Sequence, residues 1–375
     1  MGRIYLDYNA STPIDSAITE VMRQFLVEHF GNPSSGHWAS TGAKAALETA
    51  RSQVAALLGC HDDEIVFTSG GSEANNLALK GAFYKLRDKG DHIITTRVEH
   101  PAIIEPCRFL ERLDARVTFP PVDGTARIDP DALRRAIKPR TILISIMHAN
   151  NEVGTIEPIE ECARIAREHG ILFHTDAAQS VGKIPTNVNQ LGIDLLSIAG
   201  HKLYAPKGIG ALFVRRGVSL EPLIHGAGHE GGRRAGTESA LLAVSLGKAC
   251  ELARDLSPMD RVRTLRDHFW MELQKRFGSR VALNGHPTHR LPNTLSVSFV
   301  GRIGSEILAQ LDGVAATTGS ACYSGRVELS PVLDAMGVET EVGVGAVRFS
   351  LGRTSTRDEV DSVVAQLADV LAATA

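Results

Sequence analysis

The middle of the chain alternates short apolar runs with stretches in which apolar residues recur at helical spacing. Most of the apolar runs end in glycine or polar turn residues, and each is short enough to be one strand. Parallel strands need a crossover connection, so this alternation predicts an α/β fold with a mostly parallel sheet between helices. The runs are apolar at nearly every position, which fits strands that are buried on both sides. The predicted strands are 65–68, 92–96, 116–119, 141–147, 172–175, 194–199 and 210–214.

The pattern changes after about Ser239. Helical spacing dominates as far as Phe277, and short strands then return. A last helix begins with the capping-box pair Thr356 and Glu359 and continues towards the end of the chain. We therefore expect a smaller α+β domain after a boundary near residue 256. Its predicted strands are 295–299, 314–317 and 347–351.

Composition excludes several classes of protein. Hydrophobic residues make up 43% of the 375 positions and charged residues 22%, which is ordinary for a globular protein and excludes a disordered chain. The formal net charge of −3 gives no general attraction to nucleic acid or to anionic lipid, so we expect no direct nucleic-acid partner. No apolar run approaches the ~18 residues of a membrane-spanning helix, so we expect no membrane association.

The cysteines indicate a reducing compartment. There are five, an odd number, at wide spacing and without a CxxC pair. This usage is typical of free thiols rather than of disulfides or a zinc site. The first residues carry no apolar core of a secretory signal, so we expect a cytoplasmic protein.

The segment 69–75 joins a predicted strand to a predicted helix and reads SGGSEAN. Its glycines let backbone N–H groups converge at a helix N-terminus, which suits a phosphate group, and Ser72 adds a hydroxyl donor. An ordinary glycine turn before a helix cap explains the same residues about equally well.

Lys202 follows the buried strand 194–199 at a glycine turn. A desolvated lysine has a depressed pKa and can act as a Schiff-base nucleophile. Ser197 and His201 stand close enough in sequence to bind another part of the same ligand. A surface lysine in a turn is the commoner alternative.

Asp176 directly follows the predicted strand 172–175, at the edge where open α/β sheets bind ligands. A buried carboxylate there needs a cationic partner, and a protonated pyridine nitrogen would serve. The alternative, which is favoured for this residue taken alone, is an N-cap for the next helix.

Cys322 lies among small and polar residues in the segment 319–325. Structural cysteines prefer apolar faces, so this one has the surroundings of an exposed, nucleophilic thiol. An incidental loop cysteine is the alternative. By contrast, the glycines around His225 and His229 argue against a zinc-binding helix, and we expect no metal site.

Pyridoxal phosphate together with a cysteine nucleophile satisfies the phosphate, lysine, aspartate and thiol patterns at once. The chain resembles the cysteine desulfurases of the NifS/IscS family, within the fold-type I pyridoxal-phosphate enzymes, over nearly its whole length. The matching stretches are YLDYNASTP, GNPSS, FTSGGSEANN, EH at 99–100, NNEVG, HTDAAQSVGK, GHKLYAPKGIG, RRAGTES, LPNTLSVSF, GSACYSG and VRFSLGR. The resemblance implies a large cofactor-binding domain over 15–256 with a seven-stranded sheet, and a small domain formed by 1–14 and 257–375 that carries the cysteine segment.

The resemblance also implies the catalytic residues. Lys202 matches the lysine that binds the cofactor aldehyde and later moves protons. His100 matches the histidine that stacks on the pyridine ring and assists acid–base steps. Cys322 matches the thiol that accepts the substrate sulfur as a persulfide.

Further positions match residues that hold the cofactor. Asp176 matches the partner of the pyridine nitrogen, Gln179 the donor to the phenolic oxygen, and Asn151 a residue near that oxygen and the substrate carboxylate. Thr237 matches a phosphate ligand supplied by a partner subunit, which implies a homodimer. The matched phosphate contacts within one chain are Gly71, Ser72, Ser197 and His201.

The implied reaction converts L-cysteine to L-alanine and leaves a persulfide on Cys322 for a sulfur-acceptor protein, as in iron–sulfur assembly. Arg348 and Asn32 match the pair that binds the substrate carboxylate, Arg348 being suited to a bidentate grip. Two alternatives stay open: a selenocysteine lyase or another pyridoxal-phosphate lyase or aminotransferase, and a sulfur-relay subunit that is active only with a partner.

Overall fold

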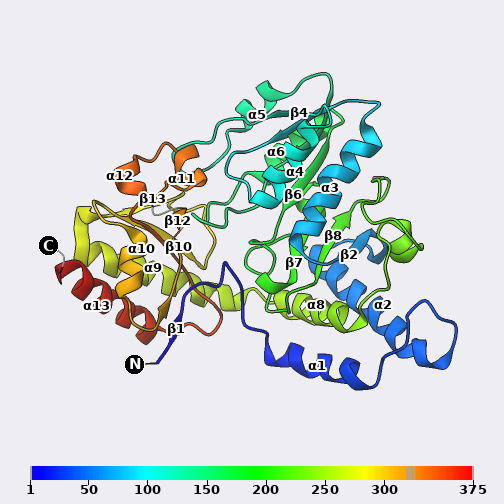
Figure 1. The fold of residues 1–375 in the computed structure, drawn as a ribbon, viewed down its shortest axis with the longest axis horizontal. Coiled ribbons are helices and arrows are strands. Elements are labelled where there is room, and N and C mark those ends of the chain that lie inside the picture. Colours follow the sequence, from blue (N-terminus) through cyan, green and yellow to red (C-terminus); the bar gives the residue numbers. More distant parts are fainter. Residues whose placement is uncertain (1, 319–321, 324–325, 374–375) are drawn as a thin grey trace.

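The computed structural model describes residues 2–318, 322–323 and 326–373. Its largest sheet has seven strands in the order β2-β8-β7-β6-β5-β3-β4 (Figure 1). Strand β8 is antiparallel to both of its neighbours, and the other pairs are parallel. The predicted α/β class is therefore confirmed. The strands are β2 (Ile65–Thr68), β3 (His92–Thr95), β4 (Arg116–Thr118), β5 (Thr141–Ser145), β6 (Leu172–Asp176), β7 (Leu195–Ala199) and β8 (Gly210–Val214).

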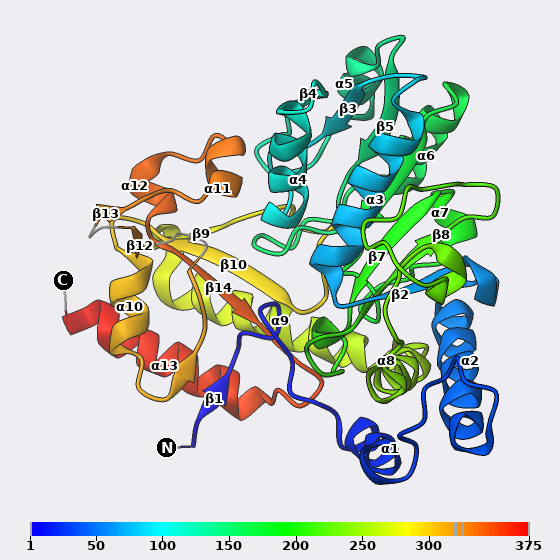
Figure 2. The same ribbon diagram turned by 45° about the vertical axis from the view of Figure 1, so that its right-hand side comes forward.

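Helices cover both faces of this sheet (Figures 1 and 2). Successive residues of a strand point to opposite faces, so Leu195 packs in one core cluster and Leu196 in the other. One face is covered by α3 (Gly71–Leu86) and α4 (Pro101–Glu111). The other is covered by α2 (Trp38–Leu58), α5 (Pro130–Ala136), α6 (Ile159–Glu168), α7 (Val188–Leu191) and α8 (Ala240–Ala253), with α1 (Ser16–Val27) beside α8.

A second, antiparallel sheet has the order β14-β10-β9 and packs against α9 and α13. The predicted capping box at the start of α13 is confirmed: Thr356 N–H donates to Glu359 Oε2 at 2.8 Å, and Glu359 N–H donates to Thr356 Oγ1 at 3.3 Å. These elements are α9 (Ser257–Phe277), β9 (Val281–Leu283), β10 (Thr294–Phe299), α10 (Gly304–Gln310), β14 (Ala346–Ser350) and α13 (Arg357–Ala373).

The first residues of the chain lie with the last third. Strand β1 (Ile4–Tyr5) pairs in parallel with β11 (Val314–Ala315), and Ile4 and Leu6 belong to the core around α9 and α13. These contacts place residues 4–6 with the core of the last third, and the predicted division into 15–256 and 1–14 with 257–375 stays a prediction. The remaining elements of this part are β12 (Cys322–Tyr323), β13 (Arg326–Val327), α11 (Pro331–Ala335) and α12 (Thr340–Gly343).

The aromatic pair Phe269 and Phe349 should stabilise the smaller core. Phe269 is fully buried on α9, and the two ring centroids are 4.9 Å apart. We expect Phe269→Ala to reduce the free energy of unfolding by about 3–5 kcal/mol, because it removes apolar contact and leaves a cavity. Met271→Ala on the exposed side of the same helix is the control. Equal losses in urea denaturation would contradict this assignment of the core.

Candidate active site

A cavity of about 550 Å³ opens at the carboxyl ends of the parallel strands, beside the start of α3. This is the edge at which open α/β sheets bind ligands. The structure thus brings together residues from five separate stretches of the sequence. The predicted site residues that line the cavity are Gly71, Ser72, His100, Asn151, Asp176, Gln179, His201 and Lys202.

Glycines let three backbone segments meet at the start of α3. Gly70 has a φ of 153°, which side chains rarely allow. A Cβ on Gly71 would lie 3.1 Å from the Cβ of Ala199, and one on Gly210 would lie 2.7 Å from the backbone of Gly70. The close packing places the unpaired N–H groups of the first turn at the cavity, where they can bind an anion.

Glu73 is an acidic residue in this first turn, and its charge is directed away from the anion position. Its Oε2 accepts from the backbone N–H of Ser69 at 2.7 Å, and its Oε1 accepts from Arg234 Nε at 2.9 Å. Burial raises the pKa of Glu73, but these hydrogen bonds outweigh it, so the net shift is downwards. The carboxylate is therefore ionised and paired within the protein.

Asp176 is the last residue of β6 and is only 6% exposed. Asn75 Nδ2 donates to its Oδ2 at 2.7 Å, and the backbone N–H of Ala178 donates to its Oδ1 at 2.9 Å. It forms no ion pair with any residue that the structure describes. A buried carboxylate without a cation fits a ligand that brings a positive charge. Sequence reasoning missed Asn75, although it stands in the same SEAN motif on the side of α3 that faces the sheet.

Lys202 lies in a short 3-10 turn after β7, Gly200–Lys202, and is half-buried. Its Nζ donates to the backbone carbonyls of Asn9 and, at 3.0 Å, of Ala10. Burial and then Arg348 lower the pKa of this amine, Asp176 and Asp7 oppose them, and the net result is a pKa of about 8. The neutral, nucleophilic fraction of this amine near neutral pH is therefore far larger than that of an ordinary lysine.

His100 caps the N-terminus of α4, where its Nδ1 accepts from the backbone N–H of Ala102 at 3.1 Å. The surrounding walls of the cavity lower the pKa of His100 by desolvation, and Lys202 adds to this while Asp176 opposes it. With Nδ1 acting as an acceptor, the neutral ring carries its proton on Nε2.

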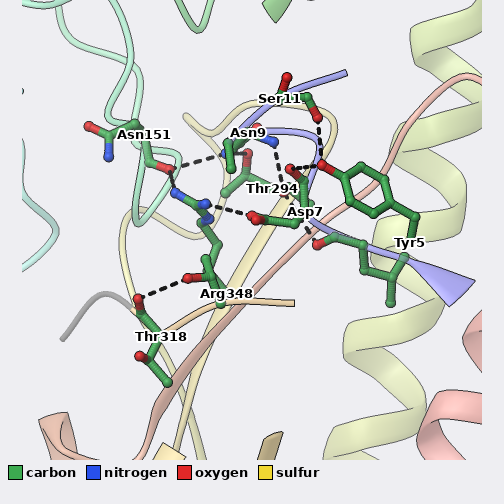
Figure 3. Close-up of polar contacts among 12 residues, drawn as sticks. Tyr5, Asp7, Asn9, Ser11, Asn151, Thr294, Thr318 and Arg348 are labelled. Atoms are coloured by element: carbon green, nitrogen blue, oxygen red, sulfur yellow. Dashed lines mark hydrogen bonds and ion pairs between the residues drawn. The ribbon is translucent and has the colours of Figure 1, made fainter. Parts of the chain in front are cut away.

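Arg348 does not line the cavity, but it contacts Asn151, which does, and Asp7 (Figure 3). One guanidinium nitrogen donates to the backbone carbonyl of Asn151 at 2.7 Å and another to Asp7 Oδ1 at 2.8 Å. Its Nε has no partner among the described residues. Arg348 is therefore joined to the site through Asn151, and its predicted contact with substrate stays a prediction.

Three other predicted residues lie outside the cavity. Ser197 is fully buried in β7, with its Oγ 3.0 Å from His174 Nε2. Asn32 is exposed between α1 and α2, and Thr237 lines a neighbouring cavity that shares Ser69 with the first. Their roles at the cofactor or substrate stay predictions.

The backbone of Cys322 forms β12, which pairs with β13. Its side chain and residues 319–321 and 324–325 lie outside the described part of the chain, so its predicted role is untested. Burial raises the pKa of the thiols of Cys60, Cys107 and Cys162 to about 12, and that of Cys250 also rises. These four are poor nucleophiles at neutral pH.

The described residues contain no group of three His, Cys, Asp or Glu side chains placed to hold a metal ion. Every helix within the described ranges is too short or too polar to span a lipid bilayer.

The cavity fits pyridoxal phosphate group by group. The start of α3 can hold a phosphate, Asp176 can pair with a protonated ring nitrogen, and the Lys202 amine can meet an aldehyde. His201 adds a buried ring nitrogen, Nδ1, that has no partner among the described residues. Fold and site together therefore define a pyridoxal-phosphate enzyme of fold type I.

Comparison with known proteins identifies the family. A sequence model described as "Aminotransferase class-V" matches residues 4–363, and the chain belongs to this pyridoxal-phosphate-dependent family. A protein named "Cysteine desulfurase IscS" from Dictyoglomus turgidum is 50% identical over 364 residues, which are 96% of this chain and 92% of that one. A "NIFS-LIKE PROTEIN" structure has a TM-score of 0.92 and 37% identity and covers 99% of both chains. The structure "SspA in complex with cysteine" has a TM-score of 0.84 and 37% identity, over 94% of this chain and 100% of that one.

The shifted pKa of Lys202 predicts a pH dependence in the cofactor-free chain. A lysine with a lowered pKa of about 8 is mostly protonated at pH 7 and mostly neutral at pH 9. The neutral, reactive fraction of Lys202 should therefore rise only about tenfold over this range, whereas that of a lysine with an ordinary pKa rises about a hundredfold, so Lys202 should label faster at pH 7 with an acylating reagent and show the shallower labelling curve. Lys44, exposed on α2, provides the comparison in the same digest. Parallel labelling curves for the two lysines, measured by mass spectrometry, would contradict the assignment.

Proposed function

We propose that this protein is a cysteine desulfurase, which takes sulfur from L-cysteine, releases L-alanine and carries the sulfur as a persulfide on Cys322. The observation that carries this proposal is that Lys202 and Asp176 line the same cavity. The chain that holds them is 50% identical to a cysteine desulfurase over 96% of its length. A relative with cysteine bound supports the choice of substrate.

Different residues of the cavity would bind different groups of the cofactor. Asp176 would keep the ring nitrogen protonated, the start of α3 and His201 would bind the phosphate, and Gln179 would donate to the ring oxygen. When bound, pyridoxal phosphate supplies an aldehyde for an amine and a ring that withdraws electrons from the adjacent carbon.

Lys202 and His100 move protons. The Lys202 amine, whose pKa is about 8, is matched to removing the proton from Cα of the substrate and returning a proton to the product. The lowered pKa of His100 keeps its ring neutral, with a proton on Nε2 to donate. Both groups face the same cavity, so one bound substrate can reach both.

The substrate carboxylate is held on the side of Asn151, with Arg348 behind it. The Arg348 guanidinium donates to the backbone carbonyl of Asn151 and to Asp7, and so supports Asn151 at this side of the cavity. Asn32 is the second residue of this carboxylate-binding pair.

The thiolate of Cys322 attacks the sulfur of the substrate. A sulfur–sulfur bond forms and the carbon–sulfur bond of the substrate breaks. The electron pair of that bond stays with the substrate carbon, which takes up a proton and leaves as L-alanine. L-cysteine and the enzyme thiol thus give L-alanine and the enzyme persulfide, with atoms and electrons balanced.

The working unit is a homodimer in which Thr237 of each chain binds the cofactor phosphate in the site of its partner. Thr237 lies in a cavity next to the Lys202 cavity and outside it in this chain, which fits a residue used by a second copy. The large domain, 15–256, holds the cofactor, and the small domain, 1–14 and 257–375, carries the thiol. The protein acts in the cytoplasm and passes its sulfur to an acceptor protein, as for iron–sulfur assembly.

Replacement of the thiol tests the function directly. In Cys322→Ser, alanine and sulfide production from L-cysteine should fall by at least a hundredfold, on the order of the loss of a nucleophile, while the visible cofactor absorbance remains. Cys60→Ser, which changes a half-buried thiol of raised pKa, should keep wild-type turnover. Full activity of Cys322→Ser would exclude it as the nucleophile.

Mixing two inactive variants tests the shared site. Lys202→Ala lacks the amine and Thr237→Ala lacks the residue given to the partner, so each homodimer should be impaired. A mixed dimer has one site with both residues and should recover about half of the activity of a two-site dimer. No recovery after subunit exchange, with mixed dimers verified by differently tagged chains, would place Thr237 in its own chain's site.

A further inference from the structure

Lys183 is a buried lysine that the proposed reaction does not use. Its side chain is only 8% exposed, and its Nζ donates to Oε1 of Gln179 at 2.9 Å. Among the described residues it forms no ion pair. An ammonium buried in this way is costly, so its pKa is lowered well below the ordinary value, first by burial and then by Lys202 and Arg348.

Oε1 of Gln179 faces the Lys183 amine, which donates to it whether or not that amine is protonated. The NH₂ group faces the opposite way, towards a carbonyl oxygen that can only accept. It donates to the backbone carbonyl of Asn9 at 2.9 Å. That same carbonyl oxygen accepts from the Nζ of Lys202.

Both donors, Gln179 and Lys202, bind the backbone carbonyl of Asn9, and Asn9 is itself held in place. Asn9 Nδ2 donates to Thr294 Oγ1 at 2.8 Å, Asn293 donates to Asn9 Oδ1 at 2.9 Å, and the Asn9 N–H donates to Ser350 Oγ at 2.9 Å. Because Asn9 is held at its side chain and its backbone, the Gln179 amide and the Lys202 amine are necessarily close neighbours. The two lysines also line one narrow cavity.

The orientation of the Gln179 amide decides whether its NH₂ group or its Oε1 lies next to the Lys202 amine. The NH₂ end cannot accept a hydrogen bond from an ammonium, and its partial positive charge disfavours one. The oxygen end would accept a hydrogen bond from the ammonium and favour it. The charged groups that face Lys202 are Arg348, Asp176 and Asp7, with His100 and His201 beside it, and none of these fixes the amide.

We propose that Lys183 is a positioning residue for Lys202: by binding Oε1 of Gln179, it keeps an oxygen away from the Lys202 amine and so keeps that amine available as a nucleophile. This inference deepens the proposed function and rests on one part of it, that Lys202 receives the cofactor.

The test follows cofactor uptake rather than turnover. The full chain is freed of cofactor, and the rate of reloading with pyridoxal phosphate is measured against pH, so that the midpoint reports the pKa of the Lys202 amine. In Lys183→Met the amide can turn its oxygen towards Lys202, and the midpoint should rise by about half a pH unit or more, the size of one ordinary hydrogen bond. Lys183→Arg keeps a donor-only side chain and should keep the wild-type midpoint.

Two comparisons separate positioning from other effects. Val181→Ala removes buried apolar contact in the same loop and should leave the midpoint unchanged. In a Gln179→Met background there is no amide oxygen to turn, so adding Lys183→Met should produce no further shift. If the shift persists there, or appears equally in Val181→Ala, Lys183 acts through its charge or its packing and the proposal is overturned.

The outcomes also distinguish this inference from the proposed function. If the wild-type chain does not take up the cofactor on Lys202, the proposed function fails. If uptake is normal and Lys183→Met leaves the midpoint unchanged, only the role of Lys183 fails. If Lys183→Met does not fold, Gln179→Glu replaces it: a carboxylate presents an oxygen to Lys202 at either end, so an unchanged midpoint in that variant overturns the proposal.

Discussion

The backbone carbonyl of Asn9 is the contact on which the arrangement of the site depends. It accepts hydrogen bonds from Lys202 and from Gln179, and the residue that carries it is held by Asn293 and Ser350. The large sheet supplies the lysine and the glutamine, whereas the small sheet and its flank supply the support. The amine is therefore positioned by both parts of the chain, and a displacement of the N-terminal segment would release it.

Burial without full pairing is the common physical feature of the site. Asp176 has hydrogen bonds from Asn75 and Ala178 and no ion pair within the described ranges, and Lys202 has carbonyl partners and no carboxylate. Each of these groups carries an electrostatic cost that a ligand of opposite charge, or of matching reactivity, can relieve. Glu73 is the opposite case. Its carboxylate accepts hydrogen bonds from Arg234 and Ser69, so it is paired within the protein and only lines the cavity.

The sequence predicted much of the fold, because the deciding signals are local. Strands β2 and β8 begin and end at the predicted residues, since their apolar runs are bounded by turn residues. Strand β5 ends at Ser145, two residues before its apolar run does, because the chain leaves the sheet while remaining buried. Continuous apolarity reports burial and not strand pairing, so it cannot locate such an end.

The reactive groups of the site could be predicted from the sequence, but the residues that hold those groups in place could not. Lys202, Asp176 and Gly71 follow strand ends that the pattern locates, and the family resemblance brought His100 and Gln179 to the same cavity. Asn9 and Asn75 were missed because their roles arise from contacts with residues 193 and 101 positions away. No periodicity in the sequence encodes such pairs, and only the folded chain shows them.

The pairing of β1 with β11 has a consequence for biosynthesis. Ile4–Tyr5 find their strand partner, Val314–Ala315, only after the whole stretch between them has been translated. During elongation the opening segment therefore has no native place to bind, while the seven-stranded sheet, whose last strand ends at Val214, can already assemble. A ribosome-bound chain should thus hold a formed sheet with an unfinished catalytic pocket until residues 314–315 have left the ribosome.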